Sequence, residues 1–245
     1  DYTLQNPGRE RLLTVDLAIR NNGNEGGSVE YRDPEILPGL GLFTAAGHRH
    51  RLQEDGRRWV YTDVGSVLRL ETSGARVTLF GGYKRERDEE ARLTLFPDGD
   101  VLPPEIERGR DLSQPWADND KNTVLAGTIA RVPVGPLWID AGLFYNRTED
   151  LLRHADLQLG VTGEGLVSER IMVADAGASD RSWSGEIRVG HTFTLERSSH
   201  QVAASMRGRN RFRLFGGSQR ISLGQSTVLE RDIRAAPAFT PDPRN

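Results

Sequence analysis

The residues with the clearest chemistry are four arginines at alternate positions, Arg207, Arg209, Arg211 and Arg213. Guanidinium groups stay charged at ordinary pH and bind carboxylates and other anions through paired N–H donors. Successive side chains of a β-strand point to opposite faces, so this spacing predicts one strand face lined with positive charge. The positions between them and before them are mostly apolar: Val202, Ala204, Met206, Gly208, Phe212 and Leu214. One strand is therefore predicted to lie between two different environments.

Two short motifs carry oxygen or nitrogen ligands at metal-binding spacing. The segment 118–122 places Asp118 and Asp120 like the first ligands of a calcium loop, but Ile129 stands where the loop needs its glutamate. His48 and His50 share one face of a predicted strand, yet no third ligand is visible. A strand-entry turn and a surface histidine pair are the default interpretations, so neither a metal ion nor a cofactor is predicted.

Catalytic patterns are missing as well. The chain has no cysteine, which excludes thiolate chemistry and disulfides. His191 has no positioned serine partner, and the acidic residues are scattered instead of forming a catalytic pair. A net charge of −3 over 245 residues argues against a general nucleic-acid-binding protein. We predict a protein that is not an enzyme and does not bind nucleic acid.

The elements that position these residues are predicted to be strands. Apolar and polar residues alternate along most of the chain between Gly, Asn, Asp and Pro clusters, and no segment has convincing helical periodicity. The pattern gives about twelve strands. Their ranges are 12–20, 28–33, 40–50, 59–71, 75–87, 119–134, 137–150, 157–173 (with a turn at 163–165), 183–196, 200–215 and 220–232.

The connections between the strands fall into two classes. Tight turns are predicted at 34–39, 72–74, 135–136, 163–165 and 197–199. They alternate with loops that are mostly longer and more polar, at 21–27, 52–58, 88–118, 148–154, 174–182 and 216–219. This alternation is typical of an outer-membrane barrel, and many strands reach the roughly 9–11 residues that cross a bilayer. The predicted fold is all-β: an antiparallel up-and-down transmembrane β-barrel, present as a fragment.

In such a barrel the arginine row faces the lumen, because an arginine on the lipid face at the bilayer midplane costs about 2–4 kcal/mol. Other polar residues take the same face of their own strands: Asp63, Arg69, Glu71, Lys84, Glu86, Asp140, Asp156, Gln158, Glu186 and Arg188. Tyr83 and Tyr145 lie on the apolar face near the loop ends, as in an aromatic girdle. Trp138, on the polar face, and Glu169, on the apolar face, do not follow the pattern.

One loop and the strand after it carry a resemblance to a known family. The stretch "GRDLSQPWADNDKNTVLAG" (109–127) enters a strand through a Pro-Trp pair and an Asp/Asn cluster. These residues are Pro115, Trp116, Asp118, Asn119 and Asp120. With the long hairpins, the stretch resembles the barrel of a TonB-dependent outer-membrane receptor, and "PEILPG" (34–39) is similar to the early barrel turns of that family. A full receptor of this type has about 22 strands. Residues 1–245 are therefore expected to be a partial barrel domain, without its plug and remaining strands.

The resemblance implies energised uptake of a scarce ligand, usually a ferric siderophore, across the outer membrane of a Gram-negative bacterium. The implied partners are outer-membrane lipid, the plug domain of the same full-length chain, the inner-membrane TonB energy-coupling complex and a small ligand such as a ferric chelate. The implied ligand-binding residues are Trp116, Asp118, Asp120, Arg207, Arg209, Arg211 and Arg213.

Each implied role has an alternative. The arginines pair with carboxylates such as Glu186 and Glu71 and stabilise the barrel instead of binding a ligand. Trp116 anchors the loop 88–118 at the membrane rim instead of stacking on a ligand. At the level of function, the alternatives are a passive outer-membrane pore or secretion barrel, and a soluble β-sheet binding module whose one solvated face also produces alternation.

Overall fold

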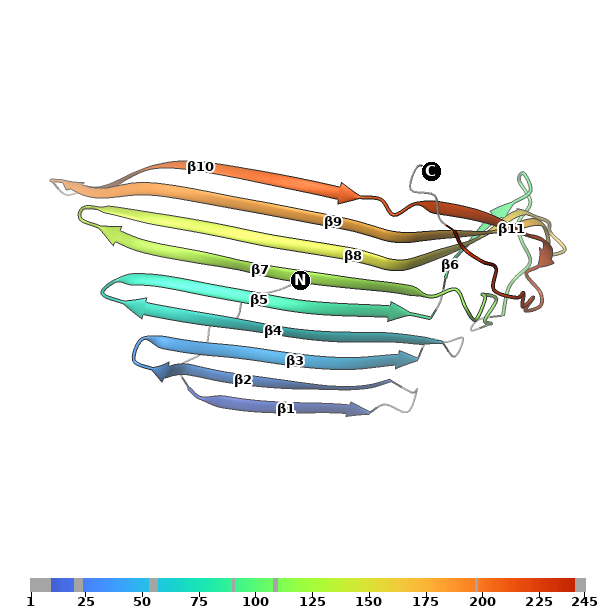
Figure 1. Cartoon of the computed structure of the whole chain (residues 1–245), viewed down its shortest axis with the longest axis horizontal. Helices are drawn as coiled ribbons and strands as arrows, with labels where there is room; N and C mark the ends of the chain where they lie inside the picture. The colour runs from blue at the N-terminus through green and yellow to red at the C-terminus, as the bar shows by residue number, and fades with distance from the viewer. Residues whose placement is uncertain are drawn as a thin grey trace.

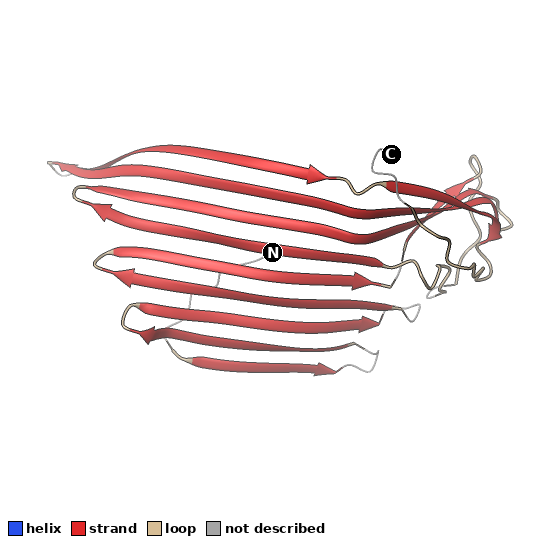
Figure 2. Ribbon diagram, in the orientation of Figure 1, coloured by secondary structure: helices blue, strands red, loops and turns tan. Residues whose placement is uncertain are grey.

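The computed structural model describes residues 10–19, 24–52, 57–89, 91–107, 110–196 and 198–240. Within these ranges the chain forms strands and no helix (Figure 2). The strands are β1 (Leu12–Ile19), β2 (Glu25–Leu37), β3 (Leu40–Leu52), β4 (Arg58–Thr72), β5 (Ala75–Asp88), β6 (Arg92–Pro97), β7 (Asn119–Val134), β8 (Leu137–Val161), β9 (Leu166–Leu195), β10 (Ser198–Leu214) and β11 (Ser218–Thr227). No helix in the described part of the chain is long and apolar enough to cross a membrane.

The strands form one 11-stranded sheet that follows the chain order, β1-β2-β3-β4-β5-β7-β8-β9-β10 (Figure 1). Neighbours along this path are antiparallel, which confirms the predicted up-and-down arrangement. Two strands lie off the path: β11 pairs with β9, and β6 runs parallel to β8. The sheet is open, with β1 and β10 at its two edges.

Short turns gather at one end of the sheet, on the left in Figure 1. The two-residue turns 38–39, 73–74 and 135–136 all lie there. Gly39 shows why a glycine is needed: its φ is +74°, and a Cβ would meet the backbone oxygen of Glu71 at 2.2 Å. The turns at 73–74 and 135–136 are where the sequence predicted them. The predicted turn 34–39 is shorter than expected, because residues 34–37 belong to β2.

The predicted loops at 148–154 and 174–182 are wrong, because both segments are strand. They belong to β8 and β9 and pair with each other, for example Leu152 with Ala176 and Asp150 with Ala178. Alternation fails there because polar residues occupy both faces of the two strands. The turn at 163–165 is consequently at the far end of two long strands, opposite the other tight turns and not beside them (Figure 1).

The outer halves of β8 and β9 form an extension of the sheet with β6 and β11 on either side (Figure 1). β10 and β11 both pair with β9 and are separated by the break at 215–217, so they act as one interrupted strand. Gly177 on β9 and Gly217 in the break have φ values of +67° and +102°, which only glycine adopts easily. Two predictions change in this extension. The predicted loop 88–118 contains the strand β6, and the predicted strand 220–232 is found at Ser218–Thr227 as β11.

The buried core lies in this extension. Two segments, 98–118 (described except for 108–109) and 228–240, cover it, and we call them the cap. One cluster joins cap residues Leu112 and Val228 to Val161 and Val167 at the ends of β8 and β9. A second cluster is built around Ala91, Ala117 and Met172, with Trp116, Leu223 and Phe239 packed against it.

The main sheet is instead exposed on both faces, and cross-strand register shows how they differ. One row of paired residues is apolar across six strands: Leu70, Val77, Ala130, Ala141, Ile187 and Met206. The next row, on the opposite face, is mostly charged: Glu71, Arg76, Arg131, Asp140, Arg188 and Ser205. We call these the apolar face and the polar face; they are the two faces predicted from alternation.

The apolar face has an aromatic boundary. Tyr145 packs on Trp183 with ring centroids 4.5 Å apart, and Tyr83 donates a hydrogen bond to Asn122 at 3.1 Å. One step further along the strands the same face carries charge, including the paired Arg147 and Arg181. The apolar band thus ends at these aromatic residues, as the girdle prediction requires.

The two residues that broke the pattern have separate explanations. Trp138 does lie on the polar face, where its ring covers Gly190 and the Arg131 guanidinium lies 5.7 Å from the ring centroid. A Cβ on Gly190 would be 2.2 Å from that ring, so the glycine makes room for the tryptophan. Glu169 is exposed and belongs to the extension, beyond the apolar band.

Candidate ligand-binding face

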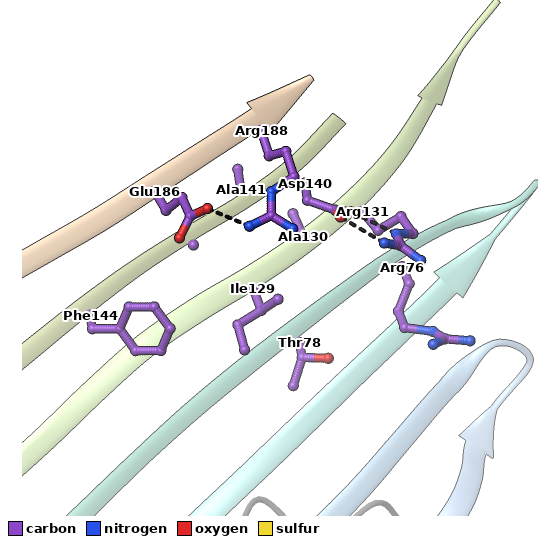
Figure 3. A pocket seen from close by; sticks show the side chains of 11 residues that line it. Arg76, Thr78, Ile129, Ala130, Arg131, Asp140, Ala141, Phe144, Glu186 and Arg188 are labelled. Carbon is purple, nitrogen blue, oxygen red and sulfur yellow. Dashed lines mark hydrogen bonds and ion pairs between the residues drawn. The ribbon is translucent and has the colours of Figure 1, made fainter. Parts of the chain in front are cut away.

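The polar face carries a charged belt near the short turns, formed by Arg69, Glu71, Arg76, Arg131, Asp140, Glu186 and Arg188. Figure 3 shows the last five of these residues. Arg131 holds Asp140 with both Nε and Nη2 at 2.6 Å, and Arg188 reaches Glu186 at 2.9 Å. Glu71 accepts from both Arg69 and Arg76. These pairs satisfy one another within the sheet. Glu71 and Glu186 are thus held by Arg69, Arg76 and Arg188, and not by the arginine row of β10 as the alternative expected.

A hollow of about 390 Å³ opens over this belt. Its floor is less polar than its rim, with Ile129, Gly142 and Phe144 between the charged residues (Figure 3). Phe144 packs on Phe80 with centroids 5.7 Å apart. The Phe80 ring lies over Gly127, where a Cβ would be 2.4 Å from a ring carbon. An aromatic layer therefore separates the belt from the upper part of the same face.

The upper part of the polar face, towards the long loops, is aromatic and cationic. Trp59 and Tyr61 stack on β4 with centroids 5.5 Å apart, and the Lys84 ammonium lies 4.9 Å from the Tyr61 centroid. Lys84 also pairs with Glu86 at 2.7 Å. Arg49 and Arg51 on β3 are the register partners of Tyr61 and Trp59. Sequence reasoning missed this group, although "WVYTD" places Trp59, Tyr61 and Asp63 on one parity.

The predicted arginine row divides into two pairs. Arg211 and Arg213 both donate to Asp180 on β9, each from Nε at 2.9 Å. Arg207 and Arg209 lie opposite Glu186 and Ser184, and neither makes an ion pair with another described residue. The row therefore lies on the polar face as predicted, and half of it is held by a carboxylate.

The two carboxylates predicted to bind ligand at the entry to β7 pair with arginines of β5 instead of joining the arginine row of β10. Asp118 pairs with Arg87 at 2.6 Å, and Asp120 pairs with Arg85 at 2.6 Å. Arg85 is on the parity of the apolar face, beyond the aromatic boundary. The hydrogen bonds that Arg85 donates to Asp120 raise the pKa of the Arg85 guanidinium above its ordinary value. Among the described residues no group of three potential metal ligands comes together.

Trp116 lies inside the cap. Its ring contacts His154 and Phe239, with centroids 5.9 Å and 5.7 Å away, and its indole N–H donates to the carbonyl oxygen of Arg234 at 2.9 Å. These contacts tie the loop before β7 to the C-terminal segment. Anchoring at the membrane rim and stacking on a ligand both stay predictions for this residue.

A buried polar network beneath the cap was not predicted. Arg170 on β9 and Asp156 on β8 are both almost fully buried and form a charged pair, with Arg170 Nε 3.0 Å and 3.1 Å from the two carboxylate oxygens. The same guanidinium donates to the carbonyl oxygens of Leu112 and Asp232 at 2.7 Å and 3.0 Å. One side chain thus links both segments of the cap to the sheet.

This chain is similar to known proteins in its structure but not in its sequence. No protein family model matches the chain. No curated protein matches it by sequence. The ferric preacinetobactin receptor BauA of Acinetobacter baumannii has a similar structure, with a TM-score of 0.69 and 15% identity over 94% of this chain and 35% of the receptor. The fold is that of part of an outer-membrane receptor barrel.

Two structures of a second receptor are similar to this chain as well. The pyoverdine outer membrane receptor FpvA of Pseudomonas aeruginosa PAO1, bound to pyoverdine, gives a TM-score of 0.69 at 11% identity, over 87% of this chain and 32% of the receptor. The structure of FpvA bound to a heterologous pyoverdine gives a TM-score of 0.68 at 12% sequence identity, over 88% of this chain and 29% of the receptor. The chain thus spans about a third of the length of these receptor chains.

Proposed function

We propose that this chain is part of the barrel of a TonB-dependent outer-membrane receptor that takes up a ferric siderophore. The observation that carries the proposal is the match of 94% of the chain to a ferric-siderophore receptor barrel. The apolar face then contacts outer-membrane lipid, and the polar face lines the lumen. The long-loop end, with the cap, faces the outside of a Gram-negative cell.

The charges of the polar face support a lumen that is occupied and not an open aqueous pore. Belt residues pair within the sheet, and both charges of these pairs border the hollow: Arg131 with Asp140, and Arg188 with Glu186. We propose that a plug domain of the full-length chain lies against this belt and couples to the inner-membrane TonB complex. Arg207 and Arg209 are proposed to contact the plug or the ligand.

The test is iron uptake by cells. A Gram-negative strain without its own siderophore receptors is supplied with the full-length protein and grown under iron limitation with a panel of ferric siderophores. We expect growth on at least one siderophore, lost when TonB is deleted. Growth that does not depend on TonB, together with steady ion conductance in planar bilayers, would instead establish a passive pore.

A further inference from the structure

A recess opens on the polar face at the long-loop end, over β1, β2 and β3. Its volume is about 720 Å³, compared with about 390 Å³ for the hollow over the belt. Its floor consists of positions with small side chains, including Ala18, Gly26 and Ser28. Because these side chains are short, the floor of the recess lies close to the backbone of β1 and β2.

The wall of the recess is formed by Arg49, Arg51 and Trp59. The Arg49 stem lies over Gly26, where a Cβ would be 3.2 Å from its Cγ. Trp59 is backed by Tyr61, whose ring is stacked against it at 24°. The aromatic pair is therefore fixed in place on a strand, and its outer ring borders the recess.

The charge pattern distinguishes this recess from the belt. Neither Arg49 nor Arg51 forms an ion pair with any residue that the structure describes, whereas the belt arginines all do. Two carboxylates line the recess, Asp16 and Glu25. Glu30 lies on the same face of β2 and pairs with Arg32. Asp63, Glu86 and Asp88 lie on this face beyond the aromatic pair. Glu86 pairs with Lys84, and Lys84 is also the register partner of Asp63. The recess thus has two exposed guanidinium groups whose positive charge is not neutralised by a bound carboxylate.

We propose that this recess binds a flat aromatic anion, specifically the catecholate rings of an anionic ferric chelate. The two guanidinium groups donate to the negatively charged ring oxygens, and the Trp59 ring packs against the catechol ring. The inference rests on the proposed function and specifies the ligand class for it. An uncharged ferric hydroxamate offers the arginines no formal negative charge and the tryptophan no aromatic ring.

The experiment measures binding to the purified full-length receptor in detergent, with a ferric tris-catecholate and an uncharged ferric tris-hydroxamate as probes. The variants are Arg49→Gln with Arg51→Gln, and separately Trp59→Leu. The matched control is Arg85→Gln with Arg87→Gln, which removes the same charge at two alternate positions on the opposite face of β5. We expect the first variant to bind the catecholate at least about tenfold more weakly and the control to bind it normally.

Each other result has a defined meaning. Equal catecholate binding by the wild type and both recess variants would overturn the inference and leave the proposed function in place. Wild-type binding of the hydroxamate alone would do the same. A wild-type receptor that binds neither probe and transports no ferric siderophore in cells would overturn the proposed function, and the inference with it.

Discussion

Arg170 is the residue on which the cap depends most. It is buried with Asp156 and holds carbonyl oxygens from both cap segments. Arg170→Met leaves an uncompensated buried carboxylate, so we expect the cap to be destabilised by about 3–5 kcal/mol. Limited proteolysis of the folded full-length protein would then cut near residues 112 and 232 in the variant only. Arg76→Met, which removes one exposed partner of Glu71, is the control and should leave the cleavage pattern unchanged.

Gly127 allows a second comparison between single residues. A Cβ there would lie 2.4 Å from the Phe80 ring and 2.8 Å from the Leu143 carbonyl oxygen, whereas a Cβ on Gly208 would meet nothing within 4 Å. We expect Gly127→Ala to destabilise the folded barrel by about 1–3 kcal/mol through overpacking. Gly208→Ala should leave stability close to wild type. Urea unfolding of the full-length protein measures both, and equal midpoints would show that the aromatic layer adapts without cost.

At the scale of the element, β10 tests the assignment of the two faces. Met206 is 74% exposed on the apolar face, in the row of Ala141 and Ile187, and Arg207 is on the polar face. We expect Met206→Arg to impair assembly into lipid by about 2–4 kcal/mol and Arg207→Ala to have little effect. Folding of the full-length protein into lipid vesicles, followed by tryptophan fluorescence, gives the comparison. Similar losses for the two variants would mean that the faces are assigned wrongly.

Strand prediction succeeded where one face of the sheet is apolar and failed where neither is. Val77 and Leu79 alternate cleanly with Arg76 and Thr78, so β5 is readable from its sequence alone. The segment 174–182 is polar and rich in small residues, and it is strand only because β8 pairs with it. The parallel pairing of β6 depends on a partner about sixty residues later in the chain, which no local pattern encodes.

The candidate site was partly predictable for the same reason. Parity placed the arginine row on the polar face, but it did not reveal that Asp180 holds Arg211 and Arg213, because Asp180 lies in a segment predicted to be loop. Trp59 could have been singled out as an aromatic residue on the polar parity. Its role at the recess also requires Arg49 and Arg51, which only the register of β3 with β4 brings beside it.

At the scale of the whole molecule, the two edges of the open sheet determine whether the chain can fold on its own. Among the described residues, β1 and β10 have no neighbour on one side, and lipid offers no partner for unpaired backbone groups. We expect residues 1–245, expressed alone, to aggregate or to form no heat-resistant barrel. Electrophoresis in detergent with and without heating detects the folded form by its altered mobility. Clean two-state folding of the monomeric chain would contradict this expectation.

The cap also determines what an antibody would recognise on this protein. Its two segments are far apart in the sequence and are joined by tertiary contacts, including the hydrogen bonds of Gln114 with Asp232 and Arg234 and those that Arg170 donates to Leu112 and Asp232. A serum raised against the folded protein would therefore contain antibodies to a discontinuous epitope. Synthetic peptides copied from either segment alone would fail to compete for those antibodies, and boiling the antigen would abolish the reaction.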